Sequence, residues 1–132
     1  MDKRYTKHVG CVYSTKYHIV WCPKYRKSIL LDEIAQRCSE LICDKAQQHE
    51  WAVESIAVMP DHVHVFISAT PMDAPQYIAN QLKGYTSRRL MQEFPSIRKK
   101  LPTLWSRSYF INTVGSVSSK AIEHYIEAQK GR

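Results

Sequence analysis

The sequence has little glycine and proline, and it has no long stretch without charge. Only 4 of its 132 residues are glycine and 6 are proline, which excludes a collagen, a flexible linker and a low-complexity chain. The longest run without Lys, Arg, Asp or Glu is the 12 residues 108–119, whereas a membrane-spanning helix needs about 20 apolar residues. No apolar segment follows the basic N-terminal residues, so we expect no secretory signal and a cytoplasmic protein.

Closely spaced cysteine pairs are also absent. None of the four cysteines forms a Cys-x-x-Cys pair, which argues against a structural zinc site. Reduced thiols in the cytosol are the simplest interpretation of Cys11, Cys22, Cys38 and Cys43. The 44% hydrophobic and 23% charged residues are typical of a globular protein, and the length fits one domain over residues 1–132.

Negative charge is scarce as well. The chain has 12 Asp and Glu against 19 Lys and Arg, which gives a formal net charge of +7. The excess lies in two blocks: residues 1–27 and residues 83–107 each carry a net charge of +6, whereas residues 28–82 carry −6. Much of the acidic block is explained by the outer face of a helix. The two basic blocks indicate a polyanionic partner such as a nucleic acid.

Hydrophobic periodicity predicts alternating strands and helices. Two-residue alternation and β-branched residues predict strands over residues 11–21, 51–59, 62–69 and 109–114. Three- and four-residue steps predict helices over residues 31–49, 74–91 and 119–130, with a basic loop over residues 95–103. The order β-α-β-β-α-β with one extra helix predicts an α+β, ferredoxin-like or RRM-like fold, in which two helices cover one face of an antiparallel sheet.

The most distinctive feature lies in the predicted strand over residues 62–69. Side chains two apart on a strand share a face, so His62 and His64 project together. The other face, which must be the core side, carries Val63, Val65 and Ile67. Two neutral imidazoles at this spacing can chelate one divalent ion, although two histidines on an exposed strand are also common as plain surface residues.

Two histidine-dependent enzyme classes do not fit this strand. Histidine-triad nucleotide hydrolases need a third histidine in the alternating series, and that position is Phe66. Zincins place their histidine pair on a helix. No glycine-rich loop of the Walker type is present, so we expect no nucleotide cofactor.

The predicted last helix carries Tyr125 and Gln129, which are four residues apart and therefore share a helical face. A helix this short is marginal alone and must dock, and the open sheet face is available to it. Docked there, it would place a phenol nucleophile and an amide oxygen ligand beside His62 and His64. The alternative is a packing tyrosine and a surface glutamine, which is common in amphipathic helices.

Five segments, in this order, resemble the HUH-type single-tyrosine transposases of small bacterial and archaeal insertion sequences, which move as single-stranded DNA. The resemblance covers residues 13–129, and the family is named after two histidines around a hydrophobic residue. The matching segments are residues 17–26 (YHIVWCPKYR), 59–64 (MPDHVH), 82–90 (LKGYTSRRL), 104–110 (LWSRSYF) and 125–129 (YIEAQ).

The resemblance implies a metal-dependent enzyme that cleaves and rejoins single-stranded DNA, with its tyrosine helix at about residues 118–130. It implies Mg²⁺ or Mn²⁺ held by His62, His64 and Gln129. It implies Tyr125 as the nucleophile, which forms a 5′-phosphotyrosine and frees a 3′-OH. It also implies a homodimer in which the tyrosine helix can serve the other protomer, and a hairpin substrate near the end of the element.

The basic blocks then have a predicted role in binding DNA phosphates. We expect the second block to contact the hairpin through Lys83, Arg88, Arg89 and Arg107. We expect the first block to hold the single strand near the site through Lys24, Arg26 and Lys27. Tyr85 and Tyr109 are candidates for stacking on unpaired bases, whereas Trp105 is expected in the core.

Two other function classes stay open. One is a domesticated HUH endonuclease or relaxase-like protein that acts on genomic hairpins. The other is a non-catalytic nucleic-acid-binding module on an RRM-like sheet. Such a module needs aromatic residues on its central strands, where this sequence places His62 and His64.

Overall fold

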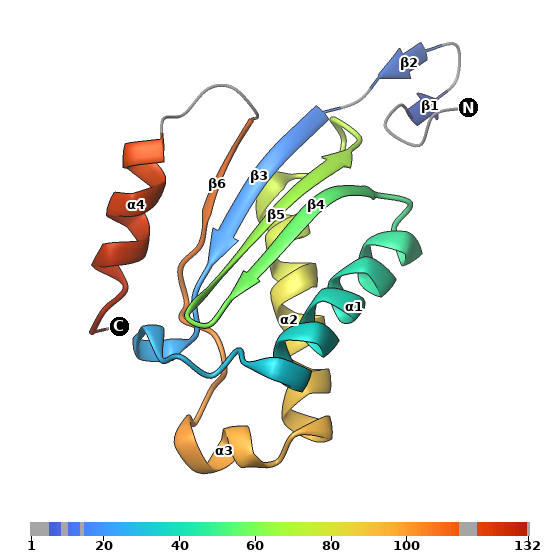
Figure 1. The fold of residues 1–132 in the computed structure, drawn as a ribbon. Helices are drawn as coiled ribbons and strands as arrows, with labels where there is room; N and C mark the ends of the chain where they lie inside the picture. The colour runs from blue at the N-terminus through green and yellow to red at the C-terminus, as the bar shows by residue number, and fades with distance from the viewer. Residues whose placement is uncertain (1–5, 9–10, 14, 114–118, 132) are drawn as a thin grey trace.

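A four-stranded antiparallel sheet, covered on one face by two long helices, forms the centre of the molecule (Figure 1). The computed structural model describes residues 6–8, 11–13, 15–113 and 119–131. The sheet consists of β3 (Thr15–Trp21), β4 (Ala52–Met59), β5 (His62–Ala69) and β6 (Phe110–Thr113). The strands lie in the order β4-β5-β3-β6, and the covering helices are α1 (Asp32–Gln48) and α2 (Pro75–Glu93). This arrangement confirms the predicted ferredoxin-like α+β fold.

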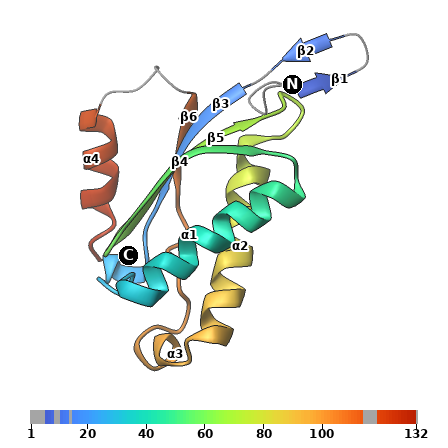
Figure 2. The ribbon, with the colours of Figure 1, turned by 45° about the vertical axis from the view of Figure 1, so that its right-hand side comes forward.

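Shorter elements surround this sheet. A separate hairpin is formed by β1 (Thr6–His8) and β2 (Cys11–Tyr13), and the 3-10 helix η1 (Lys24–Arg26) follows β3. Helix α3 (Ser96–Lys100) follows α2, and α4 (Ser119–Ala128) is the last element. In both views, α4 lies beside β6, on the side away from β3 (Figures 1 and 2). Among the described residues, none of the helices combines the length and the hydropathy that a membrane span requires.

Several predicted boundaries need correction. The strand predicted over residues 11–21 is two strands, β2 and β3, and the pairing of β2 with β1 was not predicted, because β1 is short and polar. The loop predicted over residues 95–103 contains α3, whose buried Ile97 packs into the core. Helix α2 ends at Glu93, two residues later than predicted, and it runs through Gly84, where a side chain would meet open space. Residues 114 and 118, at the edges of two predicted elements, lie outside the described residues.

The two faces of β5 are as predicted. Its apolar face is completely buried and consists of Val63, Val65 and Ile67, whereas the other face carries the half-buried His62 and His64. Helix α1 packs against the apolar face with the predicted stripe of Cys38, Leu41, Ile42 and Ala46. Burial of these aliphatic side chains is the main favourable contribution to folding.

The register of the sheet fixes which side chains meet on the open face. His64 pairs with Val20, and Val20 pairs in turn with Phe110, so these three residues form one row across β5, β3 and β6. In the next row, His18 pairs with Phe66. Directly opposed residues of neighbouring strands point to the same side of a sheet, so both rows belong to the face that α1 and α2 leave uncovered.

Trp105 is buried, as predicted, and it ties the segment before β6 to α2. Its indole Nε1 donates a 3.0 Å hydrogen bond to Thr86 Oγ1, and this hydroxyl donates to the Leu82 carbonyl at 2.7 Å. The ring also meets Trp21 edge-on, with the centroids 5.9 Å apart. Thr86 is completely buried, so its hydroxyl is the acceptor that keeps the indole N–H satisfied.

We expect Thr86→Val to lower the free energy of unfolding by about 1–3 kcal/mol, because it keeps the side-chain shape but leaves the buried N–H of Trp105 without an acceptor. Thr86→Ser keeps the hydroxyl and is the matched control, for which we expect a smaller loss. Urea denaturation followed by tryptophan fluorescence measures both. A Thr86→Val protein as stable as the Thr86→Ser protein would contradict this role of the hydrogen bond.

Candidate active site

His62 and His64 lie next to each other on the open face of β5. Their ring centroids are 4.9 Å apart. Together with His18 and Phe66 they line an open hollow of about 460 Å³. The structure therefore brings together the two histidines that the sequence predicts as metal ligands.

Both imidazole rings are held through their Nδ1 atoms. His62 Nδ1 lies 2.7 Å from Asp61 Oδ1, and His64 Nδ1 lies 3.1 Å from His18 Nε2. A hydrogen bond at one ring nitrogen sets the orientation of the ring and leaves the other nitrogen to act as a ligand. The Nε2 atoms of His62 and His64 make no hydrogen bond with a described residue, so both are available to bind a cation.

Burial, together with the neighbouring His62 and His18, lowers the pKa of His64 to about 4. The imidazole is therefore neutral near pH 7, which is the form that coordinates metal ions. The described ranges contain no group of three or more His, Cys, Asp or Glu side chains that could hold a metal ion. The histidine pair thus offers two nitrogen atoms to a cation, and among the described residues no third side chain of these four types joins them.

His18 is part of this site, although the sequence did not indicate it. Its buried ring stacks on Phe66 with the centroids 4.2 Å apart, and on His64 at 5.2 Å. Burial lowers the pKa of His18. The alternation of β3 does place His18 on the open face, but only the register with β5 shows that it meets His64.

The predicted nucleophile and the predicted third ligand share one partner, Ser108. The Tyr125 hydroxyl lies 3.1 Å from Ser108 Oγ, and Ser108 Oγ donates a 2.8 Å hydrogen bond to Gln129 Oε1. Since a hydroxyl group has a single proton, Ser108 accepts from Tyr125 while it donates to Gln129. The common partner shows that Tyr125 of α4 and Gln129, which directly follows α4, point to the same side.

The Tyr125 phenol is protonated at neutral pH. Its ring packs against Phe110 of β6, with the centroids 5.9 Å apart. Burial raises the pKa of Tyr125 to about 12, although the hydrogen bond with Ser108 opposes this shift. A phenol in this environment is a poor nucleophile until its proton is removed.

Tyr125 does not lie beside the histidine pair within one chain. We expected α4 to dock over the histidines, but it docks on β6, where Phe110 and Ser108 provide its apolar and polar contacts. Phe110 and His64 belong to one row with Val20 between them, so two strand spacings, about 10 Å, separate their backbones. Gln129 lines a second hollow, of about 300 Å³, which shares no lining residue with the first.

A chain of charged contacts connects the two hollows. Arg26 of η1 binds Asp61, with Nε 3.1 Å from Oδ2, and it donates from Nη1 to Oε2 of Glu127 in α4 at 3.2 Å. Asp61 also holds His62. Arg26, predicted to hold the DNA strand, is therefore already paired with two carboxylates that belong to different parts of the site.

Lys83, predicted to contact the hairpin, is half-buried and binds the backbone. Its Nζ donates to the carbonyl oxygens of Ser106, Arg107 and Ser108 at 2.8, 3.3 and 3.1 Å. Burial lowers the pKa of Lys83 to about 8. These three hydrogen bonds fix the segment that carries Ser108, so Lys83 acts on Tyr125 and Gln129 through that serine.

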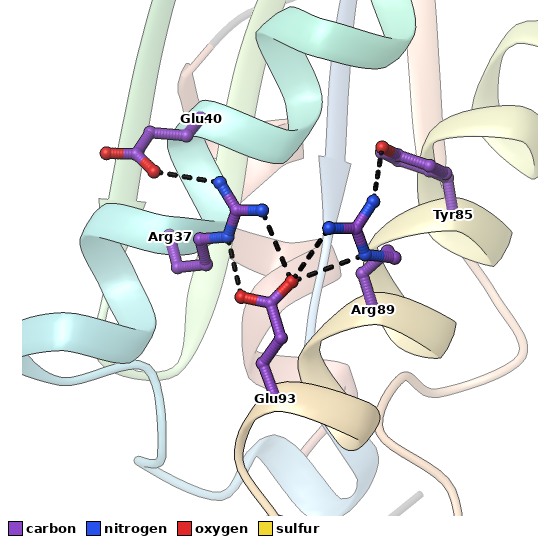
Figure 3. A network of polar contacts seen from close by, with 5 residues as sticks. All are labelled: Arg37, Glu40, Tyr85, Arg89 and Glu93. Carbon is purple, nitrogen blue, oxygen red and sulfur yellow. Dashed lines mark hydrogen bonds and ion pairs between the residues drawn. The ribbon is translucent and has the colours of Figure 1, made fainter.

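The remaining residues predicted to contact the hairpin lie on α2 and in the segment before β6. Arg89 binds Glu93 and donates to the Tyr85 hydroxyl at 3.0 Å, and Glu93 is shared with Arg37 of α1 (Figure 3). Arg88 and Arg89 both lie near the Tyr85 ring, 5.8 and 5.7 Å from its centroid. Tyr85 is therefore already in contact with cations, whereas Arg88 and Arg107 are exposed.

Known proteins share both the sequence and the fold. Residues 11–129 match the family of IS200-like transposases. The chain belongs to this family. It is 40% identical over 122 residues to the ISDra2 transposase TnpA of Deinococcus radiodurans, a match that covers 91% of this chain and 87% of that relative. It is 27% identical over 119 residues to the IS200 transposase of Salmonella typhimurium, with 89% and 78% covered.

Solved structures confirm the architecture of this IS200-like transposase. A crystal structure of a Deinococcus radiodurans R1 protein described as a transposase matches with a TM-score of 0.87 and 35% identity, covering 96% of this chain and 99% of that chain. A REP-associated tyrosine transposase bound to a REP hairpin matches with a TM-score of 0.56 and 14% identity, covering 86% and 62%. The second match shows a common fold alone. The predicted resemblance to single-tyrosine transposases is confirmed.

We expect Lys83→Met in this transposase to lower the free energy of unfolding by about 1.5–3 kcal/mol, because the carbonyls of residues 106–108 lose a charged donor. Lys99→Met, at an exposed position of α3, is the matched control and should stay within about 0.5 kcal/mol of the parent protein. Urea denaturation provides both values. If the two variants were equally stable, the ammonium group of Lys83 would not hold the Ser108 segment.

Proposed function

We propose that this transposase cleaves and rejoins single-stranded DNA, with Tyr125 as the nucleophile and with His62 and His64 as metal ligands. One observation carries the proposal: two neighbouring imidazoles are each held at Nδ1, so that both Nε2 atoms are left to bind a cation. The half-buried phenol of Tyr125 on α4 supplies a nucleophile, and membership of a transposase family implies that DNA is broken and rejoined.

We propose Mg²⁺ or Mn²⁺ as the cation, held by His62, His64 and the amide oxygen of Gln129. Ions of this type also accept phosphate oxygens as ligands, which suits a DNA substrate. Gln129 Oε1 keeps a second lone pair besides the one that Ser108 uses, so its amide fits this role. When bound, the ion would polarise the scissile phosphate and offset the charge that develops during attack.

The proposed reaction exchanges one phosphodiester bond for another. The Tyr125 oxygen attacks the scissile phosphorus, the bond from phosphorus to the 3′ oxygen breaks, and the DNA is left with a free 3′-OH and a 5′-phosphotyrosine. The phenol gives up its proton as the new bond forms, because a pKa of about 12 keeps it in place until then. The departing 3′ oxygen takes up a proton and becomes the 3′-OH, so no proton is gained or lost overall. Attack by another 3′-OH reverses the step and rejoins DNA without nucleotide hydrolysis.

We propose that the working enzyme is a homodimer, in which the tyrosine helix of one protomer serves the histidine pair of the other. The separation of Tyr125 from His62 and His64 within one chain supports this arrangement. The weak attachment of α4 to the rest of its own chain also supports a homodimer with exchanged helices. One of its polar links to the body of the chain is the ion pair between Arg26 and Glu127. The Glu127 side chain is 64% exposed, and exposed ion pairs contribute little to stability.

The substrate that we propose is a single DNA strand with a hairpin at the end of the insertion sequence. The net charge of +7 supports a nucleic-acid partner, and the structurally similar REP-associated transposase is bound to a hairpin. Among the basic residues, we propose Arg88, Arg89 and Arg107 as hairpin contacts and Lys24 and Lys27 as contacts of the single strand. Lys83 and Arg26 act on the site through Ser108 and Asp61.

We expect wild-type protein, Mg²⁺ and a 3′-labelled single strand from the DNA flanking the gene, including its hairpin, to form a covalent adduct that survives denaturing electrophoresis. Tyr125→Phe and His62→Ala should each abolish it, as should EDTA. Tyr77→Phe, at an exposed tyrosine of α2, is the matched control and should leave the yield unchanged. An adduct in the Tyr125→Phe protein would refute the assignment of the nucleophile. A wild-type protein that binds the hairpin without any adduct would be a non-catalytic binding module.

Mixed dimers test the exchange of helices between protomers. Neither His62→Ala nor Tyr125→Phe should form an adduct alone. After the two proteins are mixed and allowed to exchange subunits, we expect adduct formation to return, because the His62→Ala chain still offers Tyr125 to the intact histidines of the other chain. The adduct should be on the His62→Ala chain, which a mass tag identifies. No recovery in verified mixed dimers would show that each tyrosine serves its own chain.

A further inference from the structure

We propose that Tyr25 is a stacking platform for one unpaired base of the DNA strand, at the point where η1 joins the two hollows. The inference rests on the proposed function, since it takes single-stranded DNA as the molecule that crosses this part of the surface. It assigns a binding role to an exposed residue of η1, whose neighbours Lys24 and Arg26 contact two parts of the site.

The conformation of Tyr25 does not serve the packing of the protein. Its side chain is 53% exposed, yet its backbone is left-handed, with φ 61° and ψ 13°. Glycine or asparagine adopts this conformation readily, whereas a bulky residue is strained in it. Strained residues persist where the surrounding structure holds them, and they concentrate at functional sites.

Contacts on both sides hold Tyr25 in this conformation. On one side, the Lys24 amide donates to the Leu104 carbonyl at 2.8 Å. On the other side, the Arg26 amide donates to the Pro23 carbonyl at 2.8 Å, and the Arg26 guanidinium is bound to two carboxylates. The neighbours of Tyr25 are therefore fixed, and the turn between them presents an exposed ring.

The position of this ring is set by the same two neighbours. Lys24 lines the hollow of Ser108 and Gln129. Arg26 pairs with Asp61, which holds His62 at the edge of the other hollow. A DNA strand that extends from one hollow to the other passes η1, where Tyr25 is the exposed aromatic residue.

The chemistry of the ring suits an unpaired base. Every base has a π-face, so stacking on an aromatic side chain tolerates different sequences, and a nearby cation adds affinity for the backbone. Lys24 Nζ lies 5.5 Å from the centroid of the Tyr25 ring. The two tyrosines predicted for stacking are less suited, since Tyr85 and Tyr109 are both half-buried, whereas Tyr25 is exposed.

The test compares two fluorescein-labelled oligonucleotides from the DNA that flanks the gene: the hairpin alone, and the hairpin with its adjoining single-stranded segment. Fluorescence anisotropy is measured in the Tyr125→Phe background, so no cleavage occurs. We expect Tyr25→Leu to weaken binding of the extended oligonucleotide about 5- to 100-fold, the usual effect of losing one base stack, and to leave binding of the hairpin unchanged. Tyr25→Phe should bind like the parent protein.

Two further variants separate stacking from a structural role. Tyr25→Asn suits the left-handed backbone and lacks the ring, so it should weaken binding as much as Tyr25→Leu while its Tm equals or exceeds that of the parent protein. Tyr77→Leu removes a tyrosine that is 44% exposed near the opposite end of β5, and it should not alter binding.

An abasic nucleotide then identifies the stacked base. At one position, removal of the base should weaken binding to the parent protein as much as the Tyr25→Leu substitution weakens it. Removal of the same base should not weaken binding to the Tyr25→Leu protein any further. Unchanged affinity of Tyr25→Leu and Tyr25→Asn for the extended oligonucleotide overturns the proposal, and so does an equal loss for both oligonucleotides. The catalytic proposal fails in a different experiment, the adduct assay, if the wild-type protein forms no adduct with DNA.

Discussion

The pairing of the central strand β3 is the constraint on which the other features of the site depend. This strand is hydrogen-bonded on both sides, to β5 and to β6, and it is buried on both faces, with Ile19 toward the core and Val20 on the open face. Its register with β5 sets His18 against His64, and its register with β6 sets the position of Phe110 and thereby of α4. A shift of one residue would turn every side chain of the strand to the opposite face.

Features that depend on one segment alone could be predicted from the sequence, and features that depend on pairing could not. The alternation within β5 is sufficient to separate His62 and His64 from the buried valines, and a four-residue step is sufficient to place Tyr125 and Gln129 on one face. The role of His18 depends on which strand β3 pairs with and in what register. The position of α4 depends on Phe110 and Ser108, whose neighbours only the folded chain reveals.

Some basic residues of this chain hold its own elements together and others are free to bind phosphate, and composition does not distinguish the two. Lys83 and Arg26 belong to the basic blocks, yet their charges are bound by carbonyl oxygens and carboxylates of the chain itself. Both residues thereby connect elements that are distant in sequence, which a count of charges cannot show. Arg107 and Lys27 are among the exposed basic residues that a phosphate backbone can reach directly.

The histidine pair lies on β5, whereas Tyr125 packs against Phe110 of β6, and this has a consequence for how the activity depends on protein concentration. Under the proposed exchange of helices, a lone protomer holds no complete site. At concentrations where dimers are rare, the number of complete sites then follows the square of the protein concentration, so a roughly tenfold fall in protein lowers cleavage about a hundredfold. Mass action alone would keep such an enzyme almost silent in a cell that makes little of it, without any inhibitor.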